Sequence, residues 1–174
     1  MLPRFPELIC SVSATTRSPR PGEVDGRDYF FLSVEEFTES IDRGEFLEWA
    51  QFAGHYYGTP KRFVEEQSAA GRDVILEIEL EGARQVLVNR PDALMIFITP
   101  PSFEELRRRL EARNTEDRAA LERRLARGKE EMDVVLNKRW QAPRQFGYVI
   151  VNESISEASD ELAGILQKTK EHNV

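Results

Sequence analysis

The sequence is poor in several features whose scarcity excludes whole classes of protein. A single cysteine among 174 residues excludes an internal disulfide and suits a reducing compartment, so we expect a cytoplasmic protein. Because Cys10 follows Leu8 and Ile9, we predict a small buried apolar side chain there rather than a nucleophile. No stretch approaches the ~20 apolar residues of a membrane helix. The two prolines near the start argue against a secretory signal.

Histidine is scarce as well, and acidic residues outnumber basic ones, 31 to 24. His55 and His172 have no metal-ligand spacing, and no Ser/His/Asp pattern is present, so the sequence predicts neither a metal site nor a triad hydrolase. The formal net charge of -7 argues against nucleic-acid binding, which relies on a basic face. A phosphate ligand must then be held by local arginine clusters. We therefore expect a small-molecule partner, with no nucleic acid and no membrane.

Short apolar runs alternate with helical segments, as in α/β proteins. We predict buried strands at residues 74–79 and 94–99, a last strand at 148–151 and a short strand at 9–12. Residues 13–60 are more polar and include further short strands at 46–52 and 56–57. The pattern favours a parallel sheet flanked by helices, with a small strand-rich insertion.

Helix boundaries are marked by capping residues. Ser33, Ser102 and Ser154 each precede a glutamate by three residues, which is the spacing of a capping box. Thr59 and Pro60 are predicted as the N-cap and first residue of a helix that ends at Gly71. A long charged helix is expected from a break near residues 114–115 to about residue 137.

Two arginines in the segment 13–20 are candidates for binding phosphate. Arg17 and Arg20 are separated by Ser18 and Pro19, and Pro21-Gly22 should turn the chain immediately afterwards. Guanidinium groups fixed in this way suit bidentate phosphate contacts. The alternative is a solvated polar loop, and this segment alone favours that alternative.

Three other side chains in the insertion are ambiguous when taken singly. The hydroxyls of Tyr29 and Tyr57 can donate to phosphate, but each residue is also typical of a half-buried strand aromatic. Glu48 lies between Leu47 and Trp49 on a predicted strand, where in/out alternation makes it a solvent-facing carboxylate by default.

Two glutamates follow the apolar run 74–76. Glu77 and Glu79 are two residues apart and so share a strand face, at the end of a strand where open α/β sheets place their ligands. Such a pair can accept from the N1–H and N2–H groups of guanine or organise magnesium through water. The alternative is a strand that simply runs out into solvent.

Residues 107–124 are rich in arginine. Arg109 and Arg113 are four residues apart and share a helix face. Interleaved glutamates make an ion-paired, solvated helix the default. The functional alternative is a mobile arginine lid that neutralises a phosphoryl group during transfer.

Taken together, these segments resemble guanylate kinases in order and spacing over nearly the whole chain. The first and third of the following blocks are specific signatures of that family. The resembling blocks are residues 11–23 (SVSATTRSPRPGE), 26–29 (GRDY), 45–50 (EFLEWA), 56–59 (YYGT), 82–84 (GAR), 100–102 (PPS) and 151–152 (VN).

The resemblance implies roles for the candidate residues. The GMP phosphate would be held by Arg17, Arg20, Tyr29 and Tyr57. Guanine would be recognised by Ser13, Glu48, Thr59 and Glu79. Lid and phosphate-clamp arginines would be Arg109, Arg113 and Arg124. The implied reaction transfers the γ-phosphoryl group of ATP to GMP with Mg²⁺, giving ADP and GDP, by a monomer or homodimer with no protein-bound metal.

The resemblance also implies an architecture. The fold would be a P-loop-NTPase-like parallel sheet with flanking helices, a strand-rich GMP-binding insertion and a helical lid. Residues 1–174 would form one domain, divided into a GMP-binding subdomain (12–70), a core (71–101 and 138–174) and a lid region (102–137).

The sequence departs from the family in three respects. The 174 residues hold no G-x-x-x-x-G-K-[ST] loop; at the one Gly-Lys pair, Gly128-Lys129, Arg123 and Glu130 replace the required glycine and Ser/Thr. We therefore expect the first strand and the ATP-phosphate loop to be missing. Glu77 and Glu79 stand where many members have aspartate. Residues 137–146 form a longer connection than usual.

These departures leave three interpretations. The chain binds GMP but is poorly active because it lacks the ATP-phosphate loop. Alternatively, it is a non-catalytic guanylate-kinase-like binding module that recognises GMP or a phosphopeptide. The third interpretation is a non-functional fragment, because a missing central strand would leave its neighbours unpaired.

Overall fold

The computed structural model describes residues 5–52, 54–113, 118–136 and 147–172. The chain divides into two compact units, Met1–Ala93 and Leu94–Val174, and each is described by itself. The predicted longer connection at 137–146 lies outside the described residues. The predicted subdivision into subdomain, core and lid stays a prediction.

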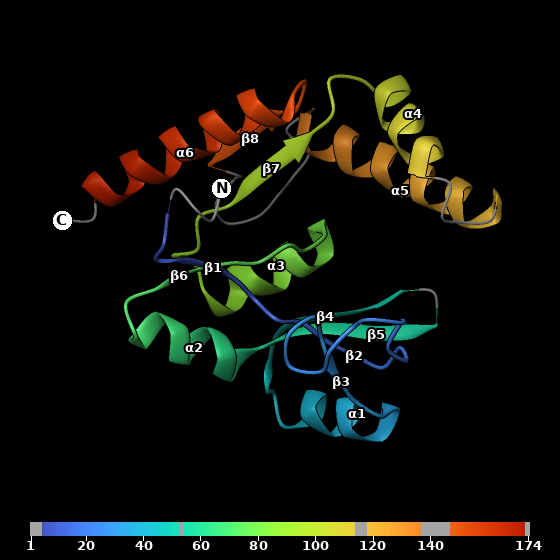
Figure 1. Cartoon of the computed structure of the whole chain (residues 1–174), viewed down its shortest axis with the longest axis vertical. Coiled ribbons are helices and arrows are strands. Elements are labelled where there is room, and N and C mark those ends of the chain that lie inside the picture. Colours follow the sequence, from blue (N-terminus) through green and yellow to red (C-terminus); the bar gives the residue numbers. More distant parts are fainter. Residues whose placement is uncertain (1–4, 53, 114–117, 137–146, 173–174) are drawn as a thin grey trace. The chain divides into compact units, whose positions relative to one another are not determined.

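Two separate sheets make up the strands of the first unit (Figure 1). Strand β1 (Leu8–Cys10) pairs in parallel with β6 (Asp73–Ile75). The second sheet has the order β3-β2-β5-β4, formed by β2 (Ala14–Thr15), β3 (Phe30–Phe31), β4 (Phe46–Phe52) and β5 (His55–Pro60). Strand β4 is thus an edge strand of this described sheet.

Helix α1 (Val34–Asp42) covers the four-stranded sheet with an aromatic stack. Its fully buried Phe37 ring lies 4.4 Å from the ring of Phe46 and 5.4 Å from that of Tyr56, centroid to centroid. The predicted capping box at its start is confirmed, because Ser33 accepts from the Glu36 amide and Glu36 accepts from the Ser33 amide. The insertion therefore has its own small core.

Two further helices belong to the first unit. Helix α2 (Lys61–Ala69) is capped by Pro60 rather than by Thr59, so the predicted N-cap is wrong. The Thr59 side chain is fully buried at the end of β5 and bonds Glu48 instead. Helix α3 (Leu80–Asn89) follows an irregular segment at 76–79. A second core, formed by Leu47, Val64 and Val86, joins β4 to both helices.

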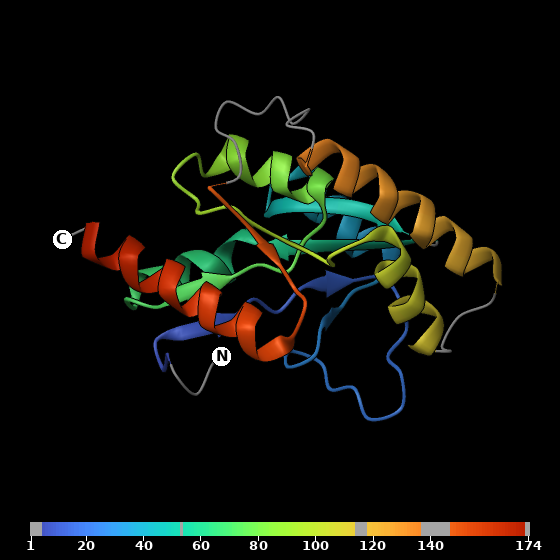
Figure 2. The same cartoon turned by 90° about the horizontal axis from the view of Figure 1, so that it is seen from above.

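In the second unit, β7 (Ile96–Thr99) pairs in parallel with β8 (Tyr148–Val151). Helix α6 (Ile155–His172) packs on β8 through Ile150, Ala158 and Ile165 (Figure 2). The arginine-rich region forms α4 (Phe103–Arg113) and α5 (Arg118–Leu136), and the predicted break near 114–115 lies outside the described residues. Parallel strands alternating with helices confirm the predicted α/β class.

The environment of the single cysteine differs from the prediction. Cys10 is exposed at the last position of β1, so its predicted burial is wrong. Cys10 is the last residue of β1, and a polar segment begins at Ser11. The neighbouring Leu8 and Ile9 gave no sign that the strand ends there.

Among the described residues, no helix combines the length and apolar character that crossing a membrane requires.

Candidate functional site

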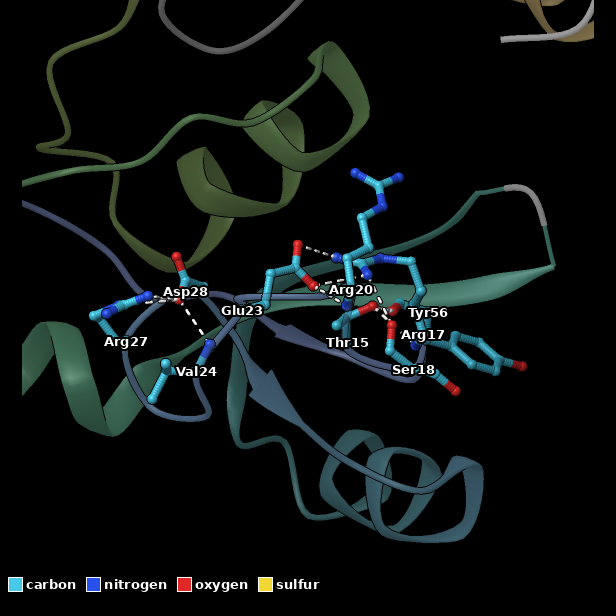
Figure 3. A network of polar contacts seen from close by, with 9 residues as sticks. All are labelled: Thr15, Arg17, Ser18, Arg20, Glu23, Val24, Arg27, Asp28 and Tyr56. Carbon is cyan, nitrogen blue, oxygen red and sulfur yellow. Dashed lines mark hydrogen bonds and ion pairs between the residues drawn. The ribbon is translucent and has the colours of Figure 1, made fainter. Parts of the chain in front are cut away.

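Arg17 is the centre of a polar network in the first unit (Figure 3). Its Nη1 and Nη2 donate to the two carboxylate oxygens of Glu23 at 3.0 and 3.0 Å, and Nη1 also donates to the Ser18 carbonyl at 2.7 Å. The Arg17 side chain is only 14% exposed. Glu23 raises the pKa of Arg17, and Arg17 in turn lowers that of Glu23, so both groups stay charged across the physiological range.

The turn after Arg20 brings Glu23 into this position. The Glu23 amide donates to the Arg20 carbonyl at 3.0 Å, and Gly22 has a φ of 90°, as position i+2 of a type II turn requires. This confirms the predicted Pro21-Gly22 turn. The Arg20 amide donates to Oε2 of Glu23 at 2.6 Å. In Figure 3 the Arg20 guanidinium extends away from the ion pair.

Two threonines hold the arginine loop on strand β5. Thr15 donates through Oγ1 to the Tyr56 carbonyl at 3.0 Å, and Thr16 Oγ1 accepts from the Tyr56 amide at 3.0 Å. The Arg17 amide then donates to Thr15 Oγ1 at 3.2 Å. The backbone that leads into Arg17 is therefore fixed by the sheet and not free in solvent.

Both predicted phosphate-binding tyrosines lie beside Arg17. The Tyr29 and Tyr57 ring centroids are 6.3 Å apart in an edge-on arrangement, and the Arg17 guanidinium carbon is 5.3 Å from the Tyr29 centroid. Phe31 places a further ring 5.9 Å from the same carbon. The structure thus brings Arg17, Tyr29 and Tyr57 together and orders the guanidinium over aromatic faces.

Glu48 is buried, which overturns the solvent-facing default predicted from alternation. Its residue exposure is 7%, and Thr59, opposite it on β5, donates through Oγ1 to Oε1 at 2.7 Å. Burial raises the pKa of Glu48 above its ordinary value of 4.5, and the nearby charge of Glu79 acts in the same direction. A buried carboxylate of this kind is typical of a binding site.

A β-bulge explains why alternation fails at Glu48. The register of β4 against β5 shifts between Phe46 and Glu48, so Leu47 is an extra residue. Three consecutive side chains become buried as a result: Phe46 joins the aromatic core under α1, Leu47 joins the core under α2 and α3, and Glu48 meets Thr59. Bulges of this kind re-aim side chains beside functional sites.

The base-reading and phosphate-binding candidates share one strand face. Tyr57 and Thr59 are two residues apart on β5 and therefore point to the same side of the sheet. Glu48 pairs with Thr59 and Thr15 pairs with Tyr57. A hollow of about 240 Å³ lies elsewhere, at the other edge of β4, and is lined in part by Trp49, Gln85 and Val88.

The other predicted base-reading residues are less constrained. Glu79 is exposed and stands at the N-cap of α3, near enough to Glu48 to affect its ionisation. Glu77 is exposed in the segment before it. Ser13 is half-buried, and its carbonyl accepts from the Phe30 amide at 2.9 Å. These positions stay candidates.

The three predicted lid arginines belong to the second unit. Arg109 donates to Glu105 at 2.6 Å and to the Asn152 carbonyl at 2.9 Å, which fastens α4 to the end of β8. Arg108 and Arg109 lower the pKa of Glu105 to about 2. Arg124 is half-buried on α5, and the side chain of Arg113 lies outside the described residues. The ion-paired interpretation of α4 is thus supported.

Sequence reasoning missed four residues of this region. Glu23 was not given a role, although a carboxylate directly after Pro-Gly is a signal that the chain turns back on Arg17 and Arg20. Gly82 lies against Glu48: a Cβ there would be 2.7 Å from Oε2. Gln85 and Asn89 on α3 form hydrogen bonds to the backbone of β4. Their partners are 36 and 42 residues away in sequence, so no local pattern could have predicted these contacts.

The buried Glu48 gives a testable pH dependence of stability. A raised pKa in the folded state means that protonated Glu48 stabilises fully below the ordinary value of 4.5, and that this contribution is lost as pH rises through the raised value. Glu48→Gln cannot ionise, so it should exceed the parent in melting temperature by roughly 2–4 °C at pH 8. Thermal unfolding at pH 4 and pH 8 measures this; an unchanged difference between the two pH values contradicts it.

Comparison with known proteins identifies close relatives. The guanylate kinase family profile matches residues 3–169. A guanylate kinase of Rubrobacter xylanophilus is 52% identical over 167 residues, which cover 96% of this chain and 83% of that protein. A guanylate kinase of Synechococcus sp. (strain JA-3-3Ab) is 48% identical over 163 residues, covering 94% of this chain and 71% of that protein.

A solved structure gives the same answer for the fold. The crystal structure of guanylate kinase from Anaplasma phagocytophilum superimposes with a TM-score of 0.72 at 34% sequence identity. The alignment covers 94% of this chain and 76% of that protein. The resemblance found in the sequence motifs therefore extends to sequence and structure over most of the chain.

Proposed function

Since the chain belongs to the guanylate kinase family, whose activity is phosphorylation of GMP by ATP, we propose that its first unit holds the GMP site. The observation that carries this proposal is the buried pair of Glu48 and Thr59. Thr59 is two residues from Tyr57 on the same face of β5, and Tyr57 lies beside Arg17. A carboxylate for the base and a guanidinium for the phosphate are the two charged contacts that GMP needs.

The phosphate end of the proposed site rests on charge and pre-organisation. Glu23 and the aromatic rings hold the Arg17 fork in place, so little side-chain entropy is lost on binding. The phosphate oxygens would accept from remaining N–H groups of Arg17, from the Arg20 guanidinium and from the hydroxyls of Tyr29 and Tyr57.

The base end of the proposed site distinguishes purines by their Watson–Crick edge. The Glu48 carboxylate would accept from N1–H and N2–H of guanine, with Glu79 as a second acceptor, while O6 takes a hydroxyl donor from Ser13. Thr59, whose hydroxyl donates to Glu48, would hold that carboxylate in place. Adenine presents no N1–H donor and would leave the buried carboxylate unpaired. A site of this kind can reject such an analogue by roughly 10⁴-fold.

For phosphoryl transfer, a GMP phosphate oxygen attacks the γ-phosphorus of ATP and ADP leaves. We assign charge neutralisation on the moving group to Arg109, Arg113 and Arg124. Within the described residues, no three His, Cys, Asp or Glu side chains converge to hold a metal. We therefore propose that Mg²⁺ arrives with ATP, coordinated mainly by the nucleotide phosphates and water.

We further propose that a polypeptide of these 174 residues turns over slowly. No G-x-x-x-x-G-K-[ST] motif occurs in them, and that loop supplies backbone amides and a lysine to the ATP phosphates. Coupled ADP release should be very low while calorimetry detects GMP binding. Ordinary turnover would contradict the proposal of slow transfer. Binding heat from a phosphoserine peptide, but none from GMP, would favour the non-catalytic binding module.

Cytoplasmic location and a monomeric or homodimeric state stay predictions.

A further inference from the structure

The outer edge of β4 is bonded by side chains of α3. Gln85 accepts from the Trp49 amide through Oε1 at 3.0 Å and donates through Nε2 to the Trp49 carbonyl at 2.9 Å. One amide side chain thereby makes both bonds that a paired residue of an antiparallel neighbour would make. Asn89 donates through Nδ2 to the Leu47 carbonyl at 2.8 Å. The residues on both sides of Glu48 are therefore held from one helix.

The Asn89 contact falls on the bulge itself. Leu47 is the extra residue of β4, and the extra residue of a bulge is left outside the ladder. By accepting from Asn89, its carbonyl gains a partner that β5 does not supply, which stabilises the bulge. The bulge is what turns the Glu48 side chain into the buried position beside Thr59.

The same face of α3 approaches Glu48 directly. Gly82, Gln85 and Asn89 follow one another by three and four residues, so they lie along one side of the helix. At Gly82 a Cβ would lie 2.7 Å from Oε2 of Glu48 and 3.3 Å from the Cβ of Ile78. The absence of a side chain there lets the helix pack against the carboxylate.

We propose that Gln85 and Asn89 are positioning residues for Glu48, so that α3, rather than β4 alone, sets the place of the base-reading carboxylate. The inference rests on the proposed GMP site. It assigns a specificity role to two residues that touch no nucleotide in that proposal. They act by fixing the backbone at Leu47 and Trp49 through the three hydrogen bonds described above.

The test uses base specificity, which a purely structural role would not alter. GMP and IMP differ only in the 2-amino group, so the ratio of their dissociation constants reports how well the carboxylate meets N2–H. Gln85→Met keeps the length of the side chain and removes both bonds to the Trp49 backbone, on the edge of β4 that no other described strand covers. Calorimetry on the 174-residue chain should show about a tenfold loss of the GMP/IMP ratio.

Val88→Gln is the matched control. Val88 lies on the same helix and is 80% exposed, so its replacement should leave both dissociation constants within twofold. Affinity for inorganic phosphate, read from competition with GMP, should be the same in the parent and in Gln85→Met, because Arg17 and its partners lie on other elements.

Gly82→Ala tests the inference without removing a hydrogen bond to the backbone. The added methyl group displaces Oε2, while alanine favours the helix and supports folding. We expect the same fall in the GMP/IMP ratio with little change in melting temperature. If Gln85→Met does not fold, Asn89→Leu, which removes the bond to the Leu47 carbonyl, decides by the same ratio. A ratio within twofold of the parent in the folded variants overturns the inference and leaves the GMP site standing. If the parent does not distinguish GMP from IMP, both the inference about α3 and the proposed GMP site are overturned.

Discussion

Arg17→Lys is expected to weaken GMP binding about 30-fold. Lysine keeps the positive charge but loses the planar fork that Glu23 and the aromatic rings hold in place. A hydrogen bond to a charged group contributes about 1.5–3 kcal/mol, and the loss of one such bond corresponds to roughly 10–150-fold in affinity. The ammonium group also forms fewer directed bonds to phosphate than a guanidinium.

Calorimetry with GMP and with guanosine separates the phosphate contact from general damage. Arg17→Lys should bind guanosine as the parent does, because the nucleoside lacks the group that Arg17 contacts. Arg27→Lys is the matched control: Arg27 lies in the same loop region, its side chain is 66% exposed, and it pairs with Asp28 at 2.8 Å. An equal loss for both nucleotide and nucleoside would falsify the assignment of Arg17 to the phosphate.

The second large effect is expected from Glu48→Gln, which should weaken GMP binding about 10²-fold. A carboxylate accepts both N1–H and N2–H, whereas an amide has one acceptor atom and turns its NH₂ group toward the other donor. Both the lost charge-assisted bond and the donor–donor contact oppose binding, and 10²-fold corresponds to about 2.7 kcal/mol. IMP lacks the 2-amino group and should lose less, so the variant should bind the two nucleotides with similar affinity.

Glu66→Gln provides the comparison for charge alone. Glu66 is an exposed carboxylate on α2 that pairs with Arg62 at 2.7 Å, so its neutralisation should leave both affinities unchanged. The expected gain in stability of Glu48→Gln at neutral pH makes unfolding an unsuitable explanation for its lost binding. Retention of the parent's preference for GMP over IMP in Glu48→Gln would remove Glu48 from the base-reading set.

Glu48→Gln is expected to weaken GMP binding and to raise stability, and both effects have the same physical origin. A buried ionised carboxylate opposes folding because water solvates it better than the interior does. The same desolvation strengthens its interaction with donors on a bound base. Sites commonly retain such a group because affinity depends on it, even though a neutral residue would be more stable there.

Features set by neighbours in sequence were predictable here. The capping box of Ser33 and Glu36 and the turn at Pro21-Gly22 both depend on residues within four positions, and both are found as predicted. The alternation of strands and helices likewise gave the fold class. Among the site residues grouped by family resemblance, the structure places Tyr29 and Tyr57 beside Arg17, and Thr59 against Glu48. The roles given to the other site residues stay predictions.

Burial at Glu48 and capping at Thr59 were not predictable from local pattern. The Glu48 side chain turns inward because of a bulge fixed by α3, whose Gln85 and Asn89 bond residues 36 and 42 positions earlier in the chain. Thr59 is a residue type typical of an N-cap, but it lies opposite Glu48, and its hydroxyl donates to that buried carboxylate. In both cases a tertiary contact outweighed the local preference.

Strand β5 contributes Tyr57 to one end of the proposed site and Thr59 to the other. Alternate residues of a strand are separated by about 6.6–6.8 Å, a distance fixed by covalent geometry and not by the closure of a flexible loop. The proposed site would therefore select ligands by the distance between base and phosphate, which has to match the spacing of alternate residues on β5. A ligand with the right groups at the wrong separation, such as a base and phosphate joined by a longer spacer, could satisfy only one end at a time.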